Sequence, residues 1–148
     1  MLIENPLSTS PIAFPVLECF HIAGFALAIG MSTLVDLRLL GIGLNKQSPS
    51  QIARAFEWWT LGGLVVAIFS GLLLFSTDPD MYFLNWSFLI KMVCLVLAVT
   101  FHYTIRRRAV FRGVSRQAGG FVACASIALW ISIIFGGIFI AVVRPGLS

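Results

Sequence analysis

The chain has 148 residues, of which 59% are hydrophobic and 11% are charged, and its formal net charge is +4. A soluble domain averages roughly 45–50% apolar and about 25% charged residues, and a domain this small has too little interior to bury so much apolar surface. The composition therefore excludes a soluble fold. The basic residues lie at the ends of apolar runs, which assigns the positive charge to membrane topology and lipid head groups rather than to nucleic acid.

The first apolar run is predicted to span the membrane at about residues 15–40. Residues 2–14 contain Pro6 and Pro11 and are followed by Pro15, and these prolines would break a helix if they lay inside it. The stretch is therefore expected to lie at the outer interface. A polar loop follows, and the second span is predicted at about 53–75. It ends at a turn that contains the Asp78–Pro79 step.

The third span is predicted at about 87–105, after the interfacial aromatic residues Tyr82 and Trp86. A basic loop over 106–116 separates it from the fourth span at about 121–143. About 20 apolar residues cross the hydrocarbon core as a helix, so the chain accommodates four spans and no separate soluble domain. The predicted fold is an all-α integral membrane four-helix bundle that forms one domain.

The basic residues predict the orientation of this bundle. Eight of the 10 Lys and Arg residues lie in or beside the first and third loops, whereas the second loop carries Asp78 and Asp80 and no basic residue. The positive-inside rule then places loops one and three in the cytoplasm and both chain termini outside. The eight residues are Arg38, Lys46, Arg54, Arg106, Arg107, Arg108, Arg112 and Arg116.

Polar residues inside the spans fall on shared helix faces at about 100° per residue. Ionisable side chains within a membrane usually face the bundle interior, so these faces are expected to meet. The three faces comprise Glu18, His21, Phe25, Ser32 and Asp36 in the first span, Glu57 and Thr60 in the second, and Ser87, Lys91, Cys94, Ala98 and His102 in the third.

Depth divides these polar residues into two groups. Near the outer surface we expect a Glu18–Lys91 ion pair beside His21. Near the inner surface, Glu57 and His102 lie at comparable depth. There Asp36, Arg38 and Arg54 are expected to form a network that neutralises charge at the membrane edge.

The only two histidines, His21 and His102, lie within predicted spans. Neutral imidazole is the usual axial ligand of membrane haem b, and Gly24 with its small neighbours would let a flat macrocycle approach the first helix. Alternatively, the histidines bond neighbouring helices and the glycines serve close packing. Counted from Pro15 and Ser87, the two histidines differ in depth by about 13 Å, or about 7 Å if the first helix starts near Pro11. One haem shared by both would require tilt, a different helix start or a second ligand of another type.

Copper is a further candidate metal, because Cys19 and His21 are close in sequence and Met31, Met81 and Met92 offer soft thioether ligands. On a helix, however, Cys19 and His21 point about 200° apart, and the methionines are scattered. The sequence also has no phosphate loop, HExxH pair or GxSxG elbow, so catalysis by the chain itself is not expected.

The segment HIAGFALAIGMSTLVDLRLLGIGL, residues 21–44, is similar to a pattern in small bacterial four-helix membrane proteins of unknown function. It resembles more loosely the membrane domain of the CopD copper-resistance family and the b561-like haem proteins. This resemblance implies a haem or copper role in electron transfer in the bacterial inner membrane. Lys91 and His102 are compatible with it, and it is carried by His21, Gly24, Gly30, Asp36, Arg38 and Gly41.

Three functions follow as hypotheses. The first is a haem b-binding electron-transfer subunit with a quinone as candidate redox partner. His21 and His102 are its candidate ligands, and Glu18, Lys91 and Glu57 are partners around the cofactor. The second is a non-catalytic accessory subunit of a larger membrane complex or a homo-oligomer, in which the polar faces hold the bundle together. The third is a copper-handling membrane protein.

Overall fold

The computed structural model describes residues 7, 10–43 and 46–142. This part of the chain contains helices and no strand. Four stretches are long and apolar enough to cross a membrane, which confirms the predicted all-α membrane bundle and makes the chain a multi-pass integral membrane protein. The elements are α2 (Ala13–Leu39), α3 (Pro49–Thr77), α4 (Pro79–Phe83), α5 (Trp86–Phe101), the π-helix η1 (His102–Arg106), α6 (Arg107–Arg112) and α7 (Arg116–Val142).

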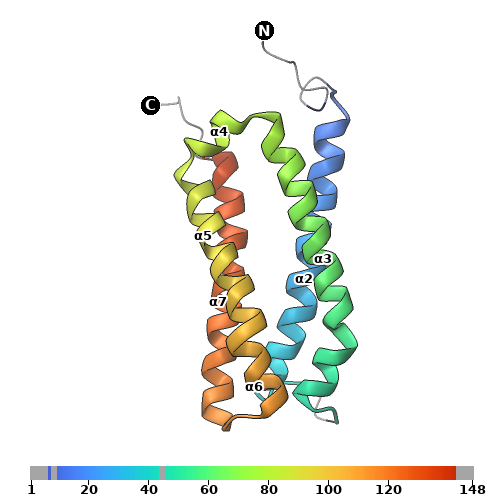
Figure 1. The fold of residues 1–148 in the computed structure, drawn as a ribbon, viewed down its shortest axis with the longest axis vertical. Coiled ribbons are helices and arrows are strands. Elements are labelled where there is room, and N and C mark those ends of the chain that lie inside the picture. The colour runs from blue at the N-terminus through green and yellow to red at the C-terminus, as the bar shows by residue number, and fades with distance from the viewer. Residues whose placement is uncertain (1–6, 8–9, 44–45, 143–148) are drawn as a thin grey trace.

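The bundle consists of two helical hairpins (Figure 1). Helix α2 packs along α3, α5 packs along α7, and the hairpins meet chiefly where α2 contacts α7. The start of α2, the short α4 and the end of α7 lie at one end of the bundle, called the outer end below. The α2–α3 connection, α6 and the start of α7 lie at the other, called the inner end.

Helix boundaries follow from local capping chemistry. Ser48 and Gln51 form a capping box at the start of α3, and Pro49 occupies its first turn, where a missing N–H costs nothing. The Asp78 side chain caps α4, and the Asn85 side chain caps α5. Gly113 ends α6 with a φ of 74°, a conformation that other residues rarely adopt.

A close glycine contact joins α2 to α3. A Cβ on Gly24 would lie 2.7 Å from the Ala67 nitrogen and 2.8 Å from the Gly63 oxygen, and a Cβ on Gly63 would lie 2.7 Å from the Gly24 oxygen. Small residues spaced four apart, Gly24 with Ala28 and Gly63 with Ala67, let the two backbones touch, as in membrane helix pairs generally. The glycines therefore determine how tightly the first hairpin packs.

The third and fourth spans differ from their predicted bounds. The third continues through η1 and α6 to Arg112 instead of ending at 105, and the fourth begins at Arg116 instead of 121. Most of the predicted basic loop is therefore helix, because arginine is a good helix former and ends a membrane helix without breaking it. Val143 and residues 2–6 and 8–9 of the predicted interfacial segment lie outside the described residues.

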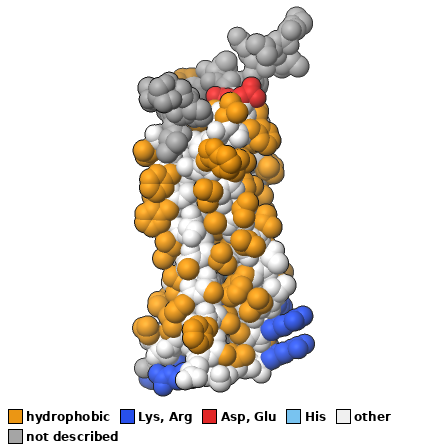
Figure 2. All heavy atoms as spheres, turned by 90° about the vertical axis from the view of Figure 1, so that its left-hand side faces the viewer, with side chains coloured by type: hydrophobic (Ala, Val, Ile, Leu, Met, Phe, Trp, Pro, Cys, Tyr) orange, Lys and Arg blue, Asp and Glu red, His pale blue; other side chains and the backbone are white. Residues whose placement is uncertain are grey.

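Apolar side chains cover the height of the face drawn in Figure 2, with acidic side chains near the outer end and Lys and Arg at the inner end. This separation of charge agrees with the pattern from which the orientation is predicted, with the inner end in the cytoplasm. The most exposed large apolar residues include Phe121 at 79%, Trp58 at 78% and Trp86 at 76%. Lipid chains cover such apolar surface in a bilayer, whereas in water so large an apolar surface would favour aggregation.

Candidate functional site

A buried ion pair lies near the inner end of the bundle. Arg106 Nε donates to Asp36 Oδ1 at 2.5 Å, and the two side chains are 5% and 0% exposed. Arg106 Nη2 also donates to the Ser32 carbonyl oxygen at 2.8 Å, and Ser126 Oγ donates to Asp36 Oδ2 at 2.7 Å. This inner cluster of Ser32, Asp36, His102, Arg106 and Ser126 therefore joins α2, η1 and α7 with its charges balanced.

The π-helix positions two members of the inner cluster, His102 and Arg106, at its first and last residues. Arg106 Nη1 and Ser32 Oγ each lie 3.4 Å from His102 Nδ1. A guanidinium only donates, so the Nδ1 lone pair is occupied and the neutral ring carries its proton on Nε2. Neither nitrogen of His102 is left with a free lone pair.

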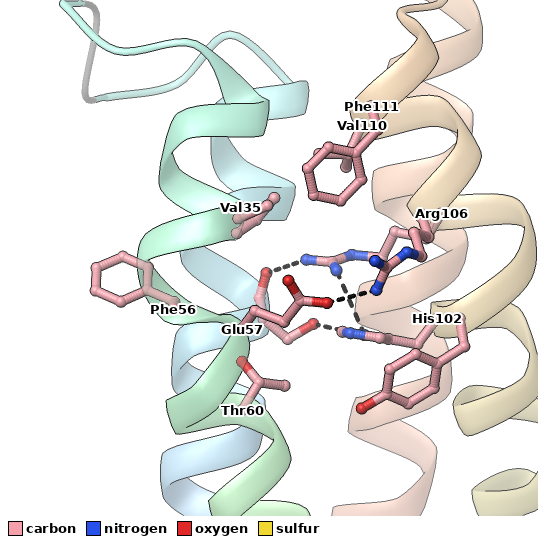
Figure 3. Close-up of a pocket in the computed structure, with 12 residues that line it drawn as sticks. Val35, Phe56, Glu57, Thr60, His102, Arg106, Val110 and Phe111 are labelled. Carbon is pink, nitrogen blue, oxygen red and sulfur yellow. Dashed lines mark hydrogen bonds and ion pairs between the residues drawn. The ribbon is translucent and has the colours of Figure 1, made fainter.

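A crevice, called the inner crevice, opens beside this cluster (Figure 3). Glu57 points into it from α3, and Arg106 and His102 point into it from the opposite wall. At its mouth, the half-exposed Arg107 pairs with Glu57. The enclosed space is about 30 Å³, enough for water but far below the several hundred Å³ of a typical ligand pocket. Its lining comprises Ser32, Val35, Ala53, Phe56, Glu57, Thr60, His102, Tyr103, Arg106, Arg107, Val110 and Phe111.

The second polar group, called the outer cluster, lies in the other half of the bundle and comprises His21, Phe25, Ser70 and Lys91. His21 Nδ1 lies 2.7 Å from the Ala67 carbonyl oxygen and 3.3 Å from Ser70 Oγ. A carbonyl oxygen only accepts, so His21 Nδ1 carries the proton and Nε2 keeps its lone pair. That lone pair faces Lys91 Nζ of the second hairpin at 3.5 Å.

Lys91 has no carboxylate partner in this cluster. Its ammonium lies 5.5 Å from the centre of the Phe25 ring, and its side chain runs past Gly136 and Gly137 of α7. The ion pairs among the described residues are Arg106–Asp36 and Arg107–Glu57, so the predicted Glu18–Lys91 pair is wrong. Glu18 is exposed instead.

The exposed Glu18 carboxylate acts on a residue at the outer end instead. Burial raises the pKa of the Tyr82 phenol, and the negative charges of Glu18 and Asp78 raise it further. Tyr82 belongs to α4, in the connection between the two hairpins, so Glu18 lies above the outer cluster rather than within it.

The two histidines lie at different depths. His102 contacts Ser32, which follows His21 by 11 residues on the same helix, and this separation is about 16 Å along the axis. Two axial ligands of one haem must lie at nearly the same level, so His21 and His102 do not share a haem in this structure. Lys91, not His102, faces His21.

Other predicted site residues are placed as follows. Gly24 lies against the backbone of α3, which fills the space that a macrocycle would need. The ring of His21 lies instead against Gly71, where a Cβ would meet ring atom Cε1 at 2.8 Å. No group of three or more His, Cys, Asp or Glu side chains that could hold a metal ion occurs in the part of the chain that the structure describes.

The predicted inner network has different members. Asp36 pairs with Arg106 rather than with Arg38 or Arg54. Arg38 donates to the Gln47 carbonyl oxygen at 2.7 Å, and Arg54 lies over the Phe111 ring. Sequence reasoning assigned Arg106 to a cytoplasmic loop and overlooked Ser126. Ser126 was detectable, because it lies on the same face of the fourth span as Ala123, Trp130 and Ile133, which are buried.

Comparison with known proteins gives one assignment. Residues 13–143 match the family of unknown function DUF6644. The chain belongs to this family. No curated protein and no solved structure matches it. The expected membership of a family of unknown function is therefore met, whereas the resemblance to CopD and b561-like proteins stays a prediction.

Proposed function

We propose that this DUF6644 protein binds haem b at the outer cluster, where His21 would hold it, and transfers electrons within the membrane. The observation that carries the proposal is the orientation of His21. Its Nδ1–H donates to the Ala67 carbonyl, which leaves the Nε2 lone pair directed at the second hairpin. Metal-binding histidines usually donate their other ring N–H to a carbonyl or carboxylate in this way.

Lys91 is the partner of His21 in the proposed site. His21 Nε2 and Lys91 Nζ are 3.5 Å apart, so both nitrogens would be available to hold the same group. An amine ligates only when neutral, and no carboxylate forms an ion pair with Lys91 among the described residues to hold it as ammonium.

The two donors support a b-type haem, and binding would require the packing around them to open. Neither cavity described in the bundle is lined by His21 or Lys91. The macrocycle would enter between the hairpins, where α3 and α5 are not among the closely packed helix pairs. Gly71 packs against the His21 ring, and Gly136 and Gly137 pack against the Lys91 side chain, so these glycines make the room that the two side chains occupy.

Bound haem would supply one-electron chemistry at a potential that its ligands and burial set. His21 and Lys91 would hold and orient it, and Phe25 would exclude lipid and water from one side. A quinone or another membrane subunit is the proposed redox partner, and the bacterial inner membrane is the proposed location. The chain offers no catalytic motif of its own, so electron transfer is proposed rather than substrate turnover.

An optical spectrum of the detergent-purified protein, oxidised and then dithionite-reduced, tests the proposal. We expect a sharp α band of six-coordinate haem b on reduction. His21→Ala should abolish it, whereas the matched control His102→Ala should retain it, because His102 has no free lone pair. A band that survives His21→Ala would overturn the assignment, as would a featureless spectrum from protein purified out of haem-replete cells together with its membrane partners.

A second candidate, a non-catalytic accessory subunit, is favoured by a different observation. Among the described residues, every buried side-chain nitrogen or oxygen atom has a hydrogen-bond partner. Polar groups that are fully satisfied by one another can serve solely to hold the helices together. This candidate predicts the featureless spectrum, so the same measurement separates the two. We do not propose copper handling, because the described part of the chain has no group of three His, Cys, Asp or Glu side chains that could hold the ion.

A further inference from the structure

Two arginines from different helices lie near the ring of Phe111, which lines the inner crevice. The guanidinium carbons of Arg54 on α3 and Arg107 on α6 lie 5.6 and 5.4 Å from the centre of the Phe111 ring. Both arginines are exposed. Arg107 also pairs with Glu57, whereas Arg54 has no ion pair within the described ranges. Two cations and one carboxylate leave the mouth with one uncompensated positive charge.

The depth of this arginine pair identifies the chemistry that it meets. Trp58 and Trp59 on the same helix as Arg54 are 78% and 60% exposed, and exposed tryptophans mark the level of lipid head groups. Lys and Arg gather at the inner end, which the positive-inside rule predicts to be cytoplasmic. Arg54 and Arg107 therefore lie where the phosphates of anionic lipids lie, beside a crevice rather than on a flat surface.

We propose that the mouth of the inner crevice binds the phosphate of an anionic phospholipid such as phosphatidylglycerol. The two guanidinium groups, preorganised by Phe111, donate charge-assisted hydrogen bonds to the phosphate oxygens. Basic pockets between helices on the cytoplasmic side recognise lipid head groups by this chemistry. The apolar walls at Phe56, Val110 and Phe111 give the acyl chain a surface, which a free phosphate ion would not use.

Native mass spectrometry of the purified protein, titrated with phosphatidylglycerol, tests this proposal without reference to haem. We expect a saturable bound lipid that phosphatidylcholine does not replace. Arg54→Gln should weaken the binding about fivefold, the effect of removing one cation near an anionic surface. The matched control Arg112→Gln, which changes an exposed arginine at the end of α6 whose guanidinium does not lie over the Phe111 ring, should leave it unchanged.

Three outcomes would overturn the proposal. Equal losses in Arg54→Gln and Arg112→Gln would mean diffuse charge attraction with no site. Full competition by millimolar inorganic phosphate would mean that the site takes a free anion rather than a lipid. Phe111→Leu, which keeps the wall apolar but removes the ring under both guanidinium groups, should also weaken binding. Unchanged binding in this second variant would contradict the site even if Arg54→Gln fails to fold.

Discussion

The inner and outer clusters both bury a cation inside the bundle, but only the inner cluster supplies a carboxylate beside it. Arg106 meets Asp36, and three elements contribute the remaining hydrogen bonds. Lys91 meets an imidazole nitrogen and an aromatic face instead. Burying a charge is costly unless it is paired. The inner cluster avoids this cost by pairing Arg106 with Asp36, whereas Lys91 of the outer cluster destabilises the bundle, and such an intramembrane residue indicates a functional role.

The largest expected effect comes from breaking the inner pair. Asp36→Asn leaves the Arg106 guanidinium buried without a counter-charge, and we expect a loss of about 3–5 kcal/mol in the free energy of unfolding. Unfolding in a detergent mixture, followed by helical circular dichroism, measures it. Arg38→Gln serves as the control, because Arg38 bonds only a loop carbonyl. Similar losses in both variants would contradict a special role for the buried pair.

The next largest loss of stability is expected at the glycine contact between α2 and α3 in the first hairpin. Gly63→Ala should cost about 1–3 kcal/mol, since its Cβ would lie 2.7 Å from the Gly24 oxygen and must push two backbones apart. The neighbouring Gly62→Ala should be neutral or slightly stabilising, because nothing lies within 4 Å and alanine favours helix. Equal thermal stability of the two variants would show that α2 and α3 do not touch here.

Removing the outer cation should act in the opposite direction to breaking the inner pair. In the haem-free protein, Lys91→Met replaces an uncompensated cation by an apolar side chain of similar length, and we expect a gain of about 1 kcal/mol after the lost His21 contact is subtracted. The same variant should alter the haem spectrum. A loss of stability as large as that of Asp36→Asn would reveal an anionic partner of Lys91.

The smallest effect is expected at the crevice mouth. Arg107→Gln should change stability by less than about 1 kcal/mol, because Arg107 and Glu57 are 49% and 40% exposed and solvent and lipid head groups screen the pair. A double-mutant cycle with Glu57→Gln measures the coupling. A coupling above about 2 kcal/mol would mean that the pair is shielded and belongs with the inner cluster.

Composition and hydropathy were sufficient to predict the four helices, because the bilayer imposes a length and an apolarity that any span must meet. The inward faces of His21, Ser32, Asp36, Lys91 and His102 also followed from helical periodicity, and the structure keeps each of them buried or half-buried. These features depend only on the spacing of residues along one helix, which can be read from the sequence.

Partners across helices could not be predicted in the same way. The sequence offered several cations near Asp36, and the choice of Arg106 depends on η1 and on the way α7 brings Ser126 to the same place. Depth estimates also placed Glu18 beside Lys91, whereas Glu18 remains exposed at the outer end. Small errors in helix start and rotation change which side chains meet, and only packing fixes them.

The distance along the chain between Asp36 and its partners has a consequence for biosynthesis. Arg106 follows Asp36 by 70 residues and Ser126 follows it by 90. At about 5–20 residues per second, α2 is complete roughly 4–14 seconds before its guanidinium partner is synthesised. During that interval the carboxylate near the end of α2 has no cation to meet in the second hairpin. The buried ion pair that joins the two hairpins can therefore form only after Arg106 has been synthesised.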